Sequence, residues 1–81
     1  MSEEEEIDQI IARCSARPIS TTEEEREDRA WWAWTGMGIL ASEGYELTEL
    51  DRQIDQLHIN GQITWAEMQE ILAIRTRIIL R

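Results

Sequence analysis

Few combinations of side chains in this 81-residue sequence are of the kinds that perform catalysis or bind metals. His58 and Cys14 are the single histidine and the single cysteine, so a zinc site would lack nitrogen and sulfur ligands. Asp51 and Asp55 are four residues apart, which is more typical of a solvated helix face than of a cation site. The sequence contains no lysine and no glycine-rich phosphate-binding loop. We therefore predict a protein that is not an enzyme and that binds no metal or cofactor.

The chain is strongly acidic, with 17 aspartates and glutamates against 8 arginines and a formal net charge of −9. Its glutamates include two uninterrupted runs, Glu3, Glu4, Glu5 and Glu6, and then Glu23, Glu24 and Glu25. Direct binding to nucleic acid is not expected, because contacts with phosphates need a basic surface. The runs fit two interpretations. They serve solubility and helix initiation, or they contact a basic protein partner, where they imitate nucleic acid.

We predict an all-α chain, in which helices alone position these residues. Apolar side chains recur with helical spacing, and no segment alternates apolar and polar residues as a strand would. We predict one small domain, residues 1–81, built as a bundle of about four short helices. The expected helices run from about Glu3 to Arg17, from Thr22 to Ser42 or Glu43, from Thr48 to Asn60, and from Thr64 to an arginine-rich end with Arg75, Arg77 and Arg81. The second helix is the longest. A kink is expected near Gly36 and Gly38, because each glycine destabilises a helix by about 1 kcal/mol relative to alanine.

The amino-terminal segment, residues 1–17, is predicted to be an acidic amphipathic helix. Its apolar face follows helical spacing and comprises Ile7, Ile10, Ile11 and Cys14. Pro18 separates this helix from the rest, so it either docks on the other helices or stays mobile until a partner covers it. The last helix is expected to bury Met68, Ile71, Leu72, Ile78 and Ile79.

The sequence also indicates a compartment. No stretch approaches 18 consecutive apolar residues, and the first six residues lack the basic and apolar regions of a signal peptide. A single cysteine permits no disulfide within the chain, which favours a reducing environment. We expect a cytoplasmic protein without membrane association.

Three of the four tryptophans, Trp31, Trp32 and Trp34, fall within four residues. Successive helical residues point about 100° apart, so the three rings cannot all face one core. Trp31 and Trp34 share a face with Gly38 and are assigned to the core, whereas Trp32 is expected to point outward. An exposed tryptophan is typical of a protein interface, although all three rings could instead pack against the first helix.

The second half of the chain has a recognisable order of helices and turns. Glu43-Gly44 ends a helix, the link Tyr45-Glu46-Leu47-Thr48 follows, a helix spans about Leu50 to Ile59, and Asn60-Gly61-Gln62-Ile63-Thr64 leads into the last helix. Sixteen residues separate the two glycines. From Glu43 onward this arrangement resembles the small antitoxins of the VbhA type, which bind and silence Fic-domain AMP-transferase toxins.

The resemblance implies a role for Glu43. In those antitoxins a helix-terminal glutamate, followed by Gly or Asn, enters the active site of the toxin and pairs with an arginine that would otherwise hold the γ-phosphate of ATP. Such a pair suits the planar guanidinium group. This chain departs from the family motif four residues earlier, because Ile39 stands where the family has serine or threonine. The resemblance therefore leaves the inhibition to Glu43 alone, with Gly44 as the glycine that follows it in the motif.

Three functions follow from these patterns. The first is a protein-binding inhibitor, antitoxin-like, that neutralises a Fic-type AMP-transferase. The alternative is an acidic inhibitor from a phage or mobile element that mimics nucleic acid and blocks a nuclease or defence complex. The third is a homodimer that pairs Trp32 and the first helix with a second copy.

Overall fold

Four helices, each preceded by a hydroxyl side chain, make up the computed structural model, which describes residues 2–80. They are α1 (Glu3–Ser15), α2 (Glu23–Ser42), α3 (Glu49–Asn60) and α4 (Trp65–Ile79). Ser2, Thr22, Thr48 and Thr64 each accept a hydrogen bond from the backbone N–H three residues later. The described residues contain no strand, so the all-α prediction is confirmed. Arg81, expected near the end of the last helix, lies outside the described residues.

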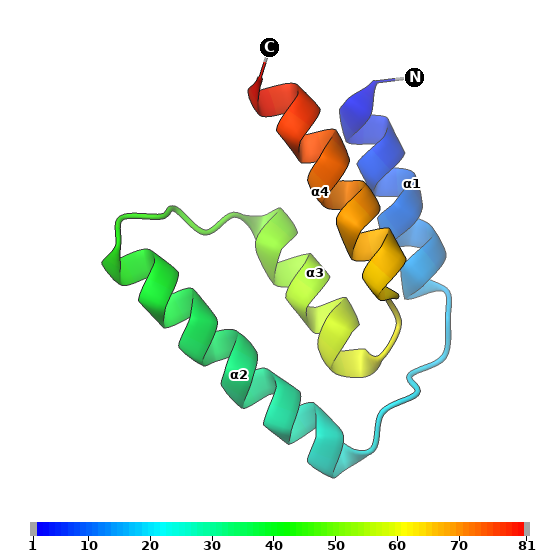
Figure 1. Ribbon diagram of the computed structural model, residues 1–81. Coiled ribbons are helices and arrows are strands. Elements are labelled where there is room, and N and C mark those ends of the chain that lie inside the picture. Colours follow the sequence, from blue (N-terminus) through cyan, green and yellow to red (C-terminus); the bar gives the residue numbers. More distant parts are fainter. Residues whose placement is uncertain (1, 81) are drawn as a thin grey trace.

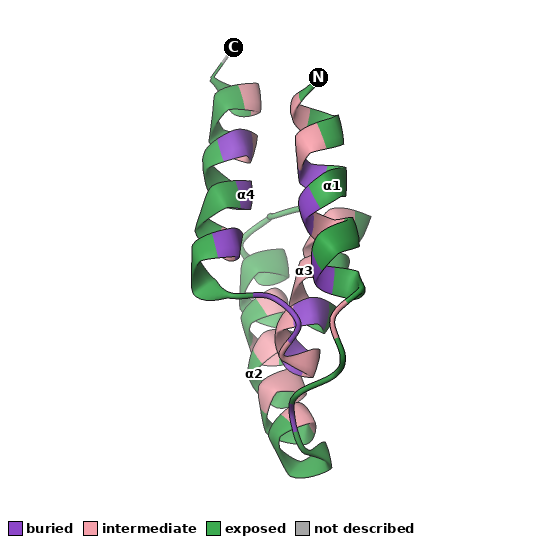
Figure 2. Cartoon of the chain, turned by 90° about the vertical axis from the view of Figure 1, so that its right-hand side faces the viewer, coloured by how far each residue is buried: buried purple, intermediate pink, exposed green. Residues whose placement is uncertain are grey.

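Helices α1 and α4 lie side by side and carry most of the core (Figure 1). The buried positions of both helices face one another (Figure 2). The core cluster contains Ile7, Ile10, Cys14, Leu57, Ile63, Ile71 and Ile74. Because three of these side chains come from α1, the first helix is docked. Of the two alternatives for the amino-terminal helix, the structure shows the docked one for Glu3–Ser15.

Helix α2 stands apart from this core and packs on α3 (Figure 1). It has no buried residue, and Figure 2 shows it exposed or half-buried along its length. The half-buried side includes Ala30, Ala33 and Met37. The helix continues through Gly36 and Gly38 without a break, and Figure 1 shows no bend at the kink that was expected there.

The buried face of α4 differs from the expected one. Ile71 and Ile74 are buried, but Leu72 is 63% exposed and Ile79 is 78% exposed. The prediction that both side chains are buried is therefore wrong. The physical reason is the position of α2, which packs on α3 and leaves one side of α4 uncovered.

The turn at Gly61, which connects α3 to α4, is hydrogen-bonded to the segment that precedes α2. Gly61 has a φ of 72°, and the Ser20 hydroxyl donates to its carbonyl oxygen at 2.9 Å. The Thr21 hydroxyl donates to the carbonyl of Ile59 at 2.8 Å. These bonds fix the residues that precede Thr22, and they thereby set where α2 begins relative to α3.

Candidate functional site

Glu43 is the C-cap residue of α2, directly after Ser42, where the chain reverses. The backbone N–H of Gly44 donates to the carbonyl of Ala41 at 3.1 Å. The N–H of Tyr45 donates to the carbonyl of Leu40 at 3.0 Å. This pair of bonds is a Schellman motif, which requires positive φ after the cap, and Gly44 has a φ of 92°. The glycine therefore holds Glu43 at the tip of the helix.

The Glu43 carboxylate is exposed. It makes no hydrogen bond or ion pair with any residue from 2 to 80. The last turn of α2 has no basic residue, and a negative charge at this end of a helix is disfavoured by about 0.3–1 kcal/mol. The structure thus presents an unpaired carboxylate where the helix itself would favour a cation. A guanidinium group from another molecule could form an ion pair with the Glu43 carboxylate.

Three side chains follow one line along the outer side of α2. Trp32, Ile39 and Glu43 are spaced at i, i+7 and i+11, so they point in directions about 20° to 40° apart. All three are exposed, and Trp32 and Glu43 are separated by about 16 Å along the helix axis. This outer stripe, defined as Trp32, Ile39 and Glu43, can be laid into a groove of another protein.

The tryptophans are all exposed: Trp31 by 58%, Trp32 by 64% and Trp34 by 68%. The prediction for Trp32 is confirmed, and the assignment of Trp31 and Trp34 to the core is wrong. The small side chains Ala30 and Ala33 lie on the half-buried side instead. The rings of Trp31 and Trp32 meet edge to face, with centroids 4.8 Å apart. Together, the two rings form a large apolar surface at the Trp32 end of the outer stripe.

The two glutamate runs occupy the first turns of α1 and α2. These helix starts lie at opposite ends of the molecule (Figure 1), so the runs do not form one continuous acidic surface. Glu25 accepts a hydrogen bond from the backbone N–H of Thr22 at 3.0 Å. That bond holds the pKa of Glu25 below its usual value. This glutamate therefore contributes to the helix start itself.

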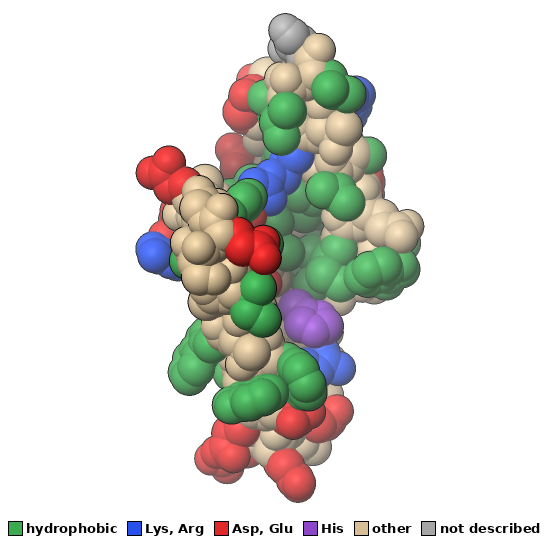
Figure 3. All heavy atoms as spheres, turned by 60° about the vertical axis from the view of Figure 1, so that its left-hand side comes forward, with side chains coloured by type: hydrophobic (Ala, Val, Ile, Leu, Met, Phe, Trp, Pro, Cys, Tyr) green, Lys and Arg blue, Asp and Glu red, His purple; other side chains and the backbone are tan. Residues whose placement is uncertain are grey.

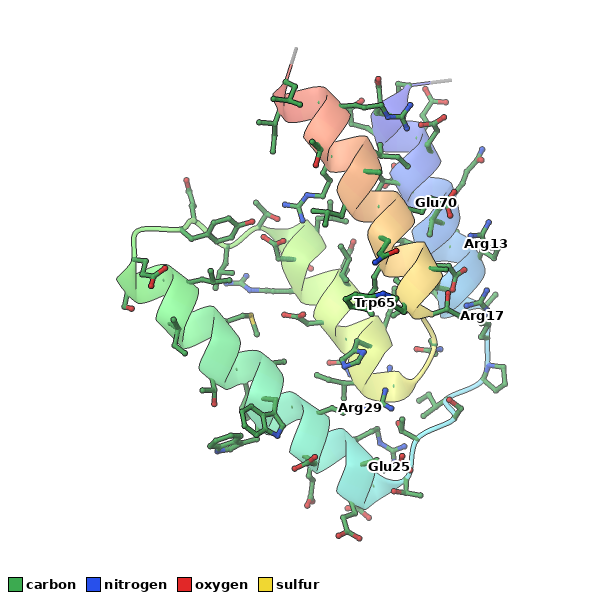
Figure 4. All side chains as sticks on the ribbon, in the orientation of Figure 1. Arg13, Arg17, Glu25, Arg29, Trp65 and Glu70 are labelled. Atoms are coloured by element: carbon green, nitrogen blue, oxygen red, sulfur yellow. The ribbon has the colours of Figure 1, made fainter. Side chains whose placement is uncertain are left out.

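Sequence reasoning missed a buried ion cluster between α1 and α4. Glu67 is 6% exposed and accepts hydrogen bonds from Arg17, including one of 2.8 Å, and from Arg13 at 3.1 Å. Figure 4 shows both arginines where the end of α1 meets the start of α4. The Arg17 hydrogen bond lowers the pKa of Glu67 well below its usual range, although burial opposes this. The capping box of Thr64 and Glu67 was predictable from its spacing. The ion pairs were not, because the arginines lie about 50 residues from Glu67 in the sequence.

A second cluster anchors the link that follows Glu43. Arg75 donates to Asp51 at 2.8 Å, and the Tyr45 hydroxyl donates to the same carboxylate at 3.3 Å. Burial opposes ionisation of Asp51, but hydrogen bonds from Thr48 and Arg75 outweigh it and lower its pKa. The chain after Glu43 is therefore tied to both α3 and α4.

The remaining candidate groups carry no reactive signature. Cys14 is fully buried, as expected, and burial raises the pKa of its thiol, which disfavours the reactive thiolate. Across residues 2–80, no group of three or more His, Cys, Asp or Glu side chains is placed to hold a metal ion. None of the helices in that range combines the length and apolar character needed to cross a membrane.

Comparisons of this chain with models of protein families, with curated proteins and with solved structures find no match.

Proposed function

We propose that this chain is a non-enzymatic inhibitor that binds another protein through the outer stripe of α2 and places the Glu43 carboxylate near its ATP site. The target is a Fic-type AMP-transferase, so the chain acts as an antitoxin. The observation that carries the proposal is the unpaired carboxylate at the exposed end of a helix with no buried residue. The Fic-type target itself is proposed from the pattern of residues that begins at Glu43.

The proposed chemistry is competition for an arginine. A guanidinium group that holds the γ-phosphate of ATP offers two parallel N–H donors, and a carboxylate accepts both. With the arginine engaged by Glu43, ATP would bind in an unproductive position and AMP would not be transferred. The backbone position from which the carboxylate extends is set by the Schellman turn at Gly44.

Ile39 stands where the antitoxin family has serine or threonine, so it would contribute to binding in a different way. Its side chain is 56% exposed and lies on the same stripe as Trp32. In a groove of the partner, Ile39 would contribute apolar contact instead of a hydrogen bond. The inhibition would then depend on Glu43 alone, and the affinity on the tryptophans.

We propose the cytoplasm as the compartment, because the one cysteine is buried and unpaired. The proposed partner is a protein, and the chain itself would bind no nucleotide, metal or nucleic acid to act on it.

The test begins with capture of a Fic-domain protein by the tagged chain at high salt. AMP transfer by that protein is then assayed with Glu43→Gln and with Glu46→Gln, a matched control in the adjacent exposed link. We expect Glu43→Gln to restore AMP transfer at least about tenfold while the complex stays intact, because a charge-assisted hydrogen bond is lost. Inhibition by Glu43→Gln equal to that by Glu46→Gln would refute the mechanism.

Nucleic-acid mimicry remains the second candidate, because Glu23 and Glu24 are exposed at the start of α2. A contact of this kind weakens steeply as salt screens the charges. Replacing the glutamates of both runs with glutamine would then abolish capture of a nuclease or defence complex. Capture that survives high salt and both replacements contradicts this alternative.

A further inference from the structure

A hollow of about 230 Å³ lies between α2 and α4, with α3 as its floor. Hydrophobic side chains gather along it (Figure 3). Its apolar lining includes Met37 and Leu40 from α2, Ile54 from α3, and Met68 and Leu72 from α4. Around the axis of α2, Met37 points about 140° and Leu40 about 80° away from Trp32, so the hollow lies on a different side of the helix from the outer stripe.

Helix α4 carries an exposed apolar stripe, whose middle residue, Leu72, lines the hollow. Trp65, Leu72 and Ile79 occur every seven residues, and each is more than half exposed. The stripe extends about 21 Å, which is the length of a helix of about 14 residues. Figure 4 shows Trp65 extending from the first turn of α4 toward α3. The spacing is that of a helix that packs along a second helix.

One unpaired carboxylate faces this apolar hollow. Asp55 lines it and is half-buried, and it makes no hydrogen bond or ion pair within residues 2–80. The nearby Arg75 is already bound to Asp51 at 2.8 Å. Burial and the charge of Asp51 raise the pKa of Asp55, and the charge of nearby His58 only partly opposes this. A cation placed in the hollow would therefore find an unsatisfied partner.

We infer that the hollow binds one amphipathic helix of another protein, with its apolar stripe along α4 and an arginine or lysine directed at Asp55. Charge complementarity selects this occupant. A second copy of the chain brings a net charge of −9, and like charges repel. Several of its arginines are also held by its own carboxylates, such as Arg17 by Glu67 and Arg77 by Glu6. The inference stands independently of Glu43.

The test is a selection on the full chain from a displayed library of helical peptides of about 16 residues. Leucine or isoleucine is fixed along one stripe, and the other positions are random. We expect enriched peptides to carry arginine or lysine near the middle of the stripe. Leu72→Glu should weaken binding of these peptides at least about tenfold, whereas Ile19→Glu, at an exposed site on the segment before α2, should not.

Asp55→Asn tests the charge directly. This variant should bind the enriched basic peptide about tenfold more weakly than the unchanged chain does. Binding of the same peptide with leucine in place of its basic residue should be unaffected. Circular dichroism of each variant checks that it is folded, and Glu43→Gln should bind as the unchanged chain does. Enriched peptides without a basic position, or equal binding by Leu72→Glu, would overturn the inference. Self-association that Leu72→Glu abolishes would assign the hollow to a second copy and overturn it as well.

Discussion

Replacing Glu67 with glutamine should destabilise the fold more than any other single loss of charge on α4. Glu67 is buried between two arginines and also accepts the backbone N–H of Thr64 at 2.9 Å. Glutamine keeps the shape and can still accept that N–H through its amide oxygen. The change therefore removes the negative charge opposite Arg13 and Arg17, and it replaces the oxygen that accepts from both arginines with an NH2 donor.

The magnitude follows from the exposure of the arginines. Breaking a fully buried ion pair costs about 3–5 kcal/mol. Here the side chain of Arg13 is 54% exposed and that of Arg17 is 38% exposed, so water can solvate both after the change. We expect a loss of about 2 kcal/mol in the free energy of unfolding, because solvent screening reduces the value for a buried pair. For a domain of this size that corresponds to a fall of about 8–16 °C in Tm.

Glu70→Gln is the matched control, because it makes the same change one turn further along α4. Its carboxylate is 56% exposed and lies 3.9 Å from Arg13, so the loss should be below about 0.5 kcal/mol. Thermal unfolding followed by circular dichroism measures both variants. Equal Tm values for Glu67→Gln and Glu70→Gln would refute the reasoning.

The pH dependence gives a second check on the same variant. The pKa of Glu67 is lower in the folded state than in the unfolded chain, where glutamate titrates near about 4.3. Its stabilisation is therefore complete above that pH and is lost progressively as the pH falls below it. The difference between the unchanged chain and Glu67→Gln should narrow below about pH 4. A difference that stays constant from neutral pH to about pH 2.5 contradicts the assignment of the shifted carboxylate to Glu67.

Further predictions concern glycine and tryptophan. Gly61→Ala should cost about 2 kcal/mol or more in urea unfolding, because φ is positive and the new methyl group would fall against the Ser20 hydroxyl; a neutral result would mean that the turn relaxes. Gly36→Ala should instead stabilise the protein by up to about 1 kcal/mol in the same measurement, since nothing lies within 4 Å of the added carbon; destabilisation would contradict a regular helix there. Trp32→Ala should change the unfolding free energy by less than about 0.5 kcal/mol but weaken capture of the partner at least about tenfold. Unchanged capture would remove Trp32 from the interface.

Helix starts and stops could be predicted because their signals act over three or four residues. Thr22 with Glu25, and Thr64 with Glu67, form the capping boxes that their spacing indicates. Gly44 gives the end of α2 for the same local reason. The candidate carboxylate Glu43 was therefore predictable as a helix-terminal group.

Packing faces were less predictable, because they depend on which helix covers which. On α2, both the tryptophan side and the alanine side offered an acceptable core face, and contact with α3 selected the side with Ala30 and Ala33. On α4, Leu72 has the right spacing for burial, but α2 lies too far away to cover it. The Arg17–Glu67 pair was hidden for a related reason, since its partners become neighbours only when α1 docks on α4.

The exposure of the tryptophans determines what their fluorescence can report. All four indole rings are more than half exposed, including Trp65 at 70%. Their emission in the folded protein should already resemble that of indole in water, so unfolding would shift it little. A partner that covers Trp31, Trp32 or Trp34 would move those rings into apolar surroundings and shift the emission to shorter wavelength. The intrinsic tryptophan fluorescence of this protein should therefore report binding of a partner and not unfolding.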